Sequence, residues 1–186
     1  MGKAAKKKRQ QGLQSESLSN GKSLISSDIS SKWSLFNKPF VHFFLIAIVG
    51  FLVYSNTFNV PFHFDDAPNI VENYKLRDLS NFWPPSGLRW FGGLTFALNY
   101  YFGGLNVAGY HIVNLIIHIF NAILVYWLVI FTFRTPFFSY QQSEVSSQDN
   151  LKTYLPLFIA LLFVAHPIQT QAVTYIVQRF TSLATM

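Results

Sequence analysis

The chain has 186 residues, of which 51% are hydrophobic, 18% aromatic and only 12% charged, and its mean hydropathy is +0.27. Soluble domains carry about 25% charged residues, so this chain has too little polar surface to cover a core in water. The composition excludes a soluble single domain and predicts an all-α integral membrane protein. The absence of cysteine excludes disulfides, thiolate metal sites and thiol catalysis.

The net charge of +6 comes entirely from the N-terminal arm. Residues 1–38 hold eight Lys and Arg against two acidic residues, whereas residues 39–186 hold six of each sign. This Ser-, Gln- and Gly-rich arm predicts a disordered basic tail, which the positive-inside rule places in the cytoplasm. No aromatic residue accompanies the run Lys6–Arg9, so we expect no binding to nucleic acid.

About three stretches are expected to cross the lipid bilayer. The first covers residues 40–58, carries no charge and follows Lys38, which places its start in the cytoplasm. The second covers residues 110–133. The third covers residues 150–166, where continuous apolar character ends just before His166 and Pro167. Residues 59–107 then form an outer loop, and residues 134–153 form an inner one.

Residues 167–186 repeat apolar positions every three or four residues, with Pro167 in the first turn. This spacing predicts an amphipathic helix on the outer side. The chain ends at Met186 in the middle of the pattern, so we expect a fragment or a truncated gene product.

The second span carries a stripe of polar residues on one face. His111, Asn114, His118 and Asn121 follow at spacings of three, four and three residues, and so occupy a wedge of about 80° at 100° per residue. Polar groups on a membrane helix must face protein or a water-filled cavity. Two interpretations stay open: hydrogen bonds that hold a helix bundle together, or the lining of a substrate cavity.

Two adjacent carboxylates, Asp65 and Asp66, lie just beyond the first span. Such a pair can supply a general base towards an acceptor hydroxyl, or bind a divalent cation together with His63. The alternative is that one of them caps a short helix beginning near Ala67. Both can hold, since one carboxylate can cap while the other reacts.

An apolar, glycine-interrupted stretch from Leu88 to Gly104 predicts an interfacial or re-entrant segment. Arg89 lies at its start, at the level of lipid headgroups, and Arg179 lies on the polar side of the final helix. Each guanidinium is suited either to a phosphate or to snorkelling at the membrane interface.

Several of these residues also form a pattern of motifs. Phe64-Asp65-Asp66, Arg89, Gly109-Tyr110-His111 and His166-Pro167-Ile168-Gln169-Thr170 occur in this order, with Arg179 after them. Residues 40–186 thereby resemble the N-terminal part of the membrane glycosyltransferases of the C-type fold. The nearest branch is the transmembrane and tetratricopeptide-repeat O-mannosyltransferases and their bacterial relatives.

This resemblance implies a larger helical bundle with interfacial helices in its outer loops. It implies transfer of a mannose-like sugar from a polyprenyl-phosphate donor to a hydroxyl of an acceptor protein or glycan at the outer membrane face. Asp65 and Asp66 would be catalytic, with a divalent cation as a possible cofactor between them. Substrate-binding candidates are the two arginines and two histidines of the motifs: Arg89, Arg179, His111 and His166. The residues of the motifs look closest to those of the bacterial relatives, which favours a bacterial inner membrane over the endoplasmic reticulum.

One position departs from the family pattern, which has an acidic residue where this chain has Gln171. An amide cannot act as a base and is a poor cation ligand. The alternative function is therefore a non-catalytic membrane scaffold or a degenerate copy of the enzyme.

Overall fold

The structure, a computed structural model, describes residues 38–137 and 149–186. The predicted basic tail lies outside this part of the chain except for Lys38, and so does most of the predicted inner loop. The chain divides into two units, Met1–His42 and Phe43–Met186. In the first unit only the start of helix α2 is described, and the architecture below is that of the second unit.

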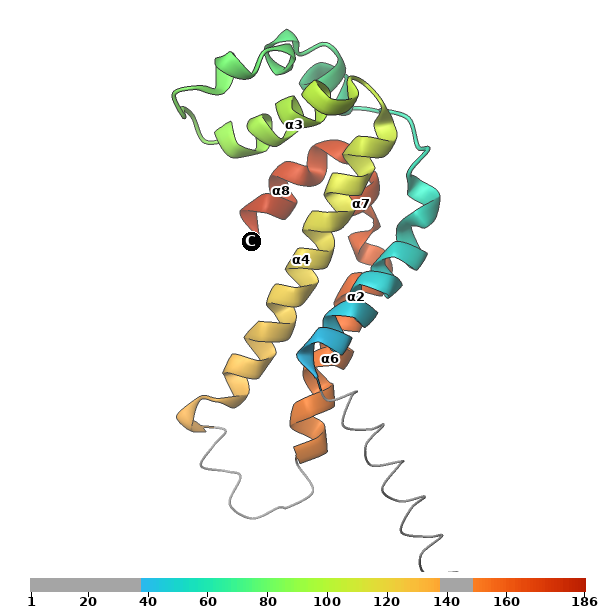
Figure 1. The fold of residues 1–186 in the computed structure, drawn as a ribbon, viewed down its shortest axis with the longest axis vertical. Helices are drawn as coiled ribbons and strands as arrows, with labels where there is room; N and C mark the ends of the chain where they lie inside the picture. Colours follow the sequence, from blue (N-terminus) through green and yellow to red (C-terminus); the bar gives the residue numbers. More distant parts are fainter. Residues whose placement is uncertain (1–37, 138–148) are drawn as a thin grey trace, which may run out of the picture. The chain divides into compact units, whose positions relative to one another are not determined.

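Three long helices run through the membrane-spanning part of the chain (Figure 1). These are α2 (Pro39–Tyr54), α4 (Val107–Phe133) and α6 (Asp149–Ala165), and a short 3-10 turn, η1 (Ser55–Thr57), continues α2. Pro39–Thr57 and Val107–Phe133 are long and apolar enough to cross a bilayer, and Thr153–Ala165 together with Pro167–Thr174 makes a third candidate bent by 51°. The prediction of an all-α membrane protein is confirmed, with two or three spans among the described residues.

Small residues let the three helices approach closely. Ile46 of α2, Ala122 and Tyr126 of α4, and Ala160 and Val164 of α6 form one buried cluster. A β-carbon added at Gly50 would lie 3.0 Å from Ile119 and 3.2 Å from Val164, tighter than ordinary van der Waals contact. Glycine at this point of α2 therefore sets the packing distance to both neighbours.

The outer loop folds into short helices. They are η2 (Ala67–Val71), η3 (Tyr74–Arg77) and η4 (Leu79–Phe82), followed by α3 (Trp90–Gly103). Side chains cap two of them, because Asn73 accepts the Lys75 N–H at the start of η3 and Asp78 accepts the Ser80 N–H at the start of η4. The Ser80 hydrogen bonds lower the pKa of Asp78.

These outer helices share a core with the end of the chain. Ile70, Leu76, Phe96, Tyr110 and Ile176 are buried together in it. The outer loop is thus a packed layer on the end of α4, with apolar contacts that fix where its polar residues lie.

The end of the chain differs from the single amphipathic helix predicted for residues 167–186. It forms four short elements: η6 (Pro167–Gln169), α7 (Thr170–Thr174), η7 (Ile176–Gln178) and α8 (Arg179–Ala184). The break falls at Tyr175, whose backbone is extended at φ −90° and ψ 107°. The N–H of Val177, freed by this break, donates to the Asp66 carboxylate. A partner distant in sequence thus stabilises the interruption, and the segment turns back along α4 (Figure 1).

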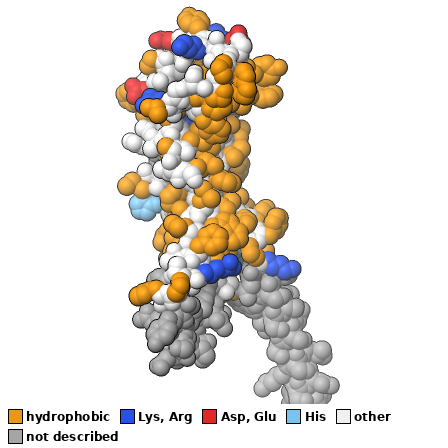
Figure 2. Space-filling model, turned by 90° about the vertical axis from the view of Figure 1, so that its left-hand side faces the viewer, with side chains coloured by type: hydrophobic (Ala, Val, Ile, Leu, Met, Phe, Trp, Pro, Cys, Tyr) orange, Lys and Arg blue, Asp and Glu red, His pale blue; other side chains and the backbone are white. Residues whose placement is uncertain are grey.

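The surface reflects this division into a spanning part and an outer layer. Figure 2 shows hydrophobic side chains over much of the visible face, whereas acidic side chains gather at the end formed by the outer-loop helices. Large apolar side chains such as Phe51, Leu52, Ile116 and Leu128 are exposed on α2 and α4. Such a surface fits a hydrocarbon environment or further helices.

Replacing Gly50 by valine tests the helix packing. Gly50→Val should lower the stability of the detergent-solubilised chain by about 1–3 kcal/mol, because the added atoms overpack the contacts with Ile119 and Val164. Thermal unfolding followed by circular dichroism measures the effect. Gly103→Val is the matched control, since a β-carbon there meets nothing within 4 Å; equal losses in both variants would contradict this packing.

Candidate functional site

All four residues of the polar stripe are buried, at 0% to 8% exposure, and all bond to backbone carbonyls. His111 Nε2 donates to Val60 O at 2.9 Å, and His118 Nε2 donates to Val164 O at 3.2 Å. The Asn114 amide donates to Ile176 O at 3.2 Å, and that of Asn121 to Ser182 O at 3.0 Å. The stripe therefore holds the outer loop, α6 and the C-terminal segment (residues 167–186) against α4, which is the first of its two predicted roles. For His111 a substrate-binding role stays a prediction.

Arg179 is fully buried at the centre of this network. Its Nε donates to Asn114 Oδ1 at 2.7 Å, its Nη1 to Asn99 Oδ1 at 2.7 Å and its Nη2 to Tyr110 O at 2.9 Å. The guanidinium also lies over the Phe96 ring, 4.3 Å from its centroid. Burial lowers the pKa of Arg179 to about 9, so it remains protonated at neutral pH. Its donors are directed to protein acceptors, and the phosphate-binding role predicted for it is untested.

Asp66 is also buried, at 0% exposure, and it joins two distant parts of the chain. One carboxylate oxygen accepts the His63 N–H at 3.2 Å, and the other accepts the Val177 N–H at 2.8 Å. Asp66 stands at the N-cap position of η2 without a side-chain capping bond. The capping alternative is thus wrong for Asp66, whose carboxylate bonds back to His63 and across to the C-terminal segment.

Asp65, in contrast, is exposed. Its N–H donates to the Tyr175 hydroxyl at 3.1 Å, and the Tyr175 ring stacks on His63 with centroids 5.4 Å apart and planes inclined by 15°. Phe64 precedes Asp65 with φ of +51°, an uncommon conformation for a phenylalanine. The outer turn, residues 63–66, thus directs one of two adjacent carboxylates inward and leaves the other at the surface.

The Tyr175 hydroxyl stays protonated near this carboxylate. Desolvation and the negative charges of Asp65 and Asp66 raise the pKa of Tyr175, although the Asp65 N–H donated to its oxygen acts in the opposite direction. A neutral phenol beside an exposed carboxylate is a hydrogen-bond donor for an incoming oxygen.

Two other predicted residues lie near the surface. Arg89 is exposed, with its guanidinium 5.3 Å from the centroid of the Phe180 ring, and it lines a hollow of about 410 Å³ together with Gly92 and Phe180. His166 is exposed, and its Nδ1 accepts the Ile168 N–H at 3.2 Å, which caps η6. The structure therefore assigns His166 a local structural bond, and its predicted substrate contact is untested.

The predicted cation site finds little support in the geometry. Within residues 38–137 and 149–186, no group of three or more His, Asp or Glu side chains is arranged to hold a metal ion. Both oxygens of Asp66 accept backbone N–H groups. These residues do not fit a bound cation.

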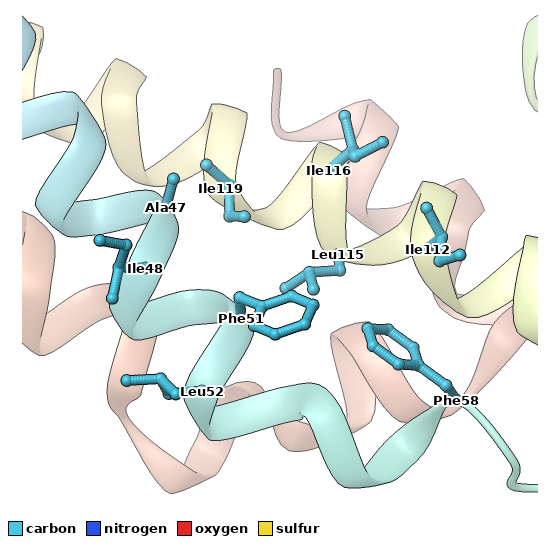
Figure 3. Close-up of a pocket in the computed structure, with 9 residues that line it drawn as sticks. All are labelled: Ala47, Ile48, Phe51, Leu52, Phe58, Ile112, Leu115, Ile116 and Ile119. Atoms are coloured by element: carbon cyan, nitrogen blue, oxygen red, sulfur yellow. The ribbon is translucent and has the colours of Figure 1, made fainter.

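An apolar groove of about 510 Å³ lies between α2 and α4 (Figure 3). Its walls come from the outer half of α2, from the residues just after it and from the facing side of α4: Ala47, Ile48, Phe51, Leu52, Phe58, Ile112, Leu115, Ile116 and Ile119. A smaller hollow of about 250 Å³ lies beside the outer turn and is lined by His63, Phe64, Thr170, Gln171, Thr174 and Tyr175. We call it the outer-turn hollow.

Sequence reasoning did not name Tyr175 or Asn99 as site residues. Asn99 falls in the apolar stretch after Arg89 and accepts a hydrogen bond from Arg179, 80 residues away. Tyr175 fits the amphipathic pattern of a continuous helix, so only the break in that helix reveals its place beside Asp65. Two signals were available for Asn99: it is polar within an apolar stretch, and Leu98-Asn99-Tyr100 belongs to the motif pattern of the resemblance.

The chain is similar to several protein O-mannosyl-transferases. It is 30% identical to protein O-mannosyl-transferase TMTC4 of Homo sapiens over 158 residues, which cover 76% of this chain and 21% of the relative. It is 30% identical to tmtc2 of Xenopus laevis over 73% of this chain and 16% of the relative, and 28% identical to Tmtc3 of Drosophila melanogaster over 78% and 18%. No family model and no solved structure matches the chain.

The chain spans about a fifth of the length of these relatives. The similarity supports the predicted resemblance to O-mannosyltransferases over about three quarters of the chain. Together with the apolar helices, it identifies the chain as a membrane protein. The C-type fold and the bacterial relatives stay predictions.

Replacing Arg179 or Arg89 by methionine, in two separate variants, distinguishes the roles of the two arginines. Arg179→Met should destabilise the chain by at least about 3 kcal/mol, because it leaves the buried acceptors on Asn114, Asn99 and Tyr110 unpaired. Arg89→Met should leave the thermal midpoint unchanged, because this side chain is exposed and packs on one aromatic ring, that of Phe180. A stable Arg179→Met variant would contradict the anchoring role.

Proposed function

We propose that this chain is part of a membrane glycosyltransferase that moves a mannose-like sugar from a polyprenyl-phosphate donor to a hydroxyl of an acceptor protein at the outer membrane face. The observation that carries the proposal is the outer turn, where Asp65 is exposed beside a protonated Tyr175 while Asp66 is held by two backbone N–H groups. The similarity to protein O-mannosyl-transferases supports the reaction class.

Asp65 is the proposed general base. An acceptor hydroxyl in the outer-turn hollow gives its proton to the Asp65 carboxylate as its oxygen forms a bond to the anomeric carbon of the sugar. The bond from that carbon to the phosphate oxygen breaks, and polyprenyl phosphate leaves with the electron pair. The Tyr175 hydroxyl can donate a hydrogen bond to one of the oxygens that takes part.

Asp66 is proposed as a positioning residue for Asp65. Its hydrogen bonds from His63 and Val177 tie the outer turn to the C-terminal segment, where the Asp65 N–H donates to the Tyr175 hydroxyl. A buried carboxylate with both oxygens engaged is poorly placed to accept a proton from a substrate, which divides the predicted catalytic pair into two roles.

Arg89 is the proposed contact for the donor phosphate. It is exposed at a hollow, its guanidinium packs on an aromatic ring, and a fork of N–H donors suits phosphate oxygens. The apolar groove between α2 and α4 has the chemistry that a polyprenyl chain requires. The cytoplasmic N-terminus and the bacterial inner membrane belong to the same proposal as predictions.

The alternative, a non-catalytic scaffold, is favoured by Gln171. This amide is exposed and lines the outer-turn hollow, where an acidic residue is expected from the family pattern. If the reaction needs a second carboxylate there, this chain cannot supply it.

The substitution Asp65→Asn tests the proposed base. Transfer of labelled sugar from a polyprenyl-phosphate donor is measured in membranes that express this chain, and in membranes that express a chimera in which it replaces the matching segment of the TMTC4 relative. Asp65→Asn should reduce transfer by about 10²–10⁴-fold, the usual contribution of a general base, without loss of membrane insertion. Asp66→Asn should reduce both transfer and thermal stability.

Asp78→Asn is the matched control, since Asp78 is an acidic residue of the same loop that only caps η4. Unchanged transfer by Asp65→Asn would rule out the base assignment. No transfer by the wild-type chain or by its chimera would favour the scaffold.

A further inference from the structure

A polar hollow of about 240 Å³ lies beside the middle of α4, and the proposed transfer reaction assigns it no role. Its walls come from α4, α6 and the C-terminal segment: His118, Asn121, Phe163, Gln169, Gln171, Ala172, Gln178, Thr181, Ser182 and Thr185. We call it the amide hollow. It is smaller than the roughly 300–1,000 Å³ of pockets for drug-sized ligands, so it suits a group of about the size of one monosaccharide.

The amide hollow has an unusual chemical character for a site in a membrane protein. The described residues that line it include no Asp, Glu, Lys or Arg, but they include carboxamides, hydroxyls, the imidazole of His118 and the ring of Phe163. The side chains of Gln169 and Gln171 make no hydrogen bond to the described part of the chain. Neutral groups that both donate and accept, beside an aromatic wall, match a neutral polyhydroxyl ligand better than a phosphate or a cation.

Asn121 is the second observation at this hollow, because one of its polar atoms is buried without a partner. The residue is only 8% exposed, and its amide donates to Ser182 O at 3.0 Å. Its carbonyl oxygen Oδ1 is buried and has no hydrogen-bond partner in the structure. Buried polar atoms are almost always paired, so this acceptor calls for a donor that the described residues do not provide.

The position of the amide hollow is the third observation. Thr181 lines both the amide hollow and the hollow of Arg89, and Gln171 lines both the amide hollow and the outer-turn hollow. The hollow of Arg89 therefore adjoins the neutral amide hollow, and the amide hollow adjoins the outer-turn hollow. A sugar phosphate has the same order of chemistry, with the sugar between its phosphate and the attacking hydroxyl.

We propose that the amide hollow binds the hexose of the donor, with Asn121 contacting it from α4 and Gln171 contacting it from the side of the outer turn. This assignment rests on the proposed function. In this assignment Gln171 contacts the sugar as a neutral amide. The change from the acidic residue of the family pattern then serves sugar binding.

The binding of a free hexoside tests the assignment without any transfer reaction. The chain is reconstituted in lipid nanodiscs, and saturation-transfer NMR is recorded with methyl α-mannopyranoside as the probe. The wild-type chain should saturate the probe. Asn121→Leu and Gln171→Leu should each reduce the signal at least fivefold, and methyl glucuronide, which carries a carboxylate, should give a signal at least fivefold weaker than the neutral probe.

Thr132→Val is the matched control, because it also replaces a polar residue of α4 but lies outside the hollow, where its hydroxyl bonds to Leu128 O. Its signal should equal that of the wild type. Gln171→Leu keeps the test valid if Asn121→Leu fails to fold, since Gln171 is exposed. No saturation by the wild type, or saturation that survives both variants, would overturn the assignment.

The outcome is separable from that of the transfer assay, because methyl mannoside has no phosphate to lose. Binding without transfer would keep the hexose site and reject the proposed reaction. Transfer without binding in the amide hollow would keep the reaction and reject this site.

Discussion

The hydrogen bonds between the polar stripe of α4 and the irregular end of the chain are the constraint on which the rest of the structure depends. Buried backbone groups need hydrogen-bond partners wherever the chain departs from a regular helix. Asn114 and Asn121 donate to the carbonyls of Ile176 and Ser182, and Arg179 Nε donates in turn to Asn114 Oδ1. Without the stripe, residues 170–184 would have little reason to leave helical geometry and fold back against α4.

The candidate site is a consequence of that folding back. The extended residue Tyr175 brings its ring onto His63 and its hydroxyl to the Asp65 N–H, while the freed N–H of Val177 holds Asp66. Two adjacent aspartates thereby acquire opposite environments, one buried and one exposed. The same segment forms a wall of all three hollows, which is why phosphate, sugar and base chemistry can be proposed side by side in so short a chain.

The sequence predicted the all-α membrane class and the polar face of α4, because apolar length and three-four spacing are local properties. It could not choose between bonding and cavity lining for His118 and Asn121, since both need the same polar face, and both residues now bond to backbone and line the amide hollow. The break at Tyr175 was not predictable, because apolar periodicity continues through it and the group that stabilises it, Asp66, is 111 residues from Val177. For the same reason the different environments of Asp65 and Asp66 could not be assigned from their adjacency.

The central claim, that the C-terminal segment closes onto the outer turn, is tested most directly by thiol cross-linking in membranes. The chain has no cysteine, so introduced pairs report without background. His63→Cys with Tyr175→Cys should cross-link efficiently, because the native rings stack with centroids 5.4 Å apart. His63→Cys with Thr132→Cys, near the other end of α4, should not. Absence of the first cross-link, or equal yields for both pairs, would contradict the account.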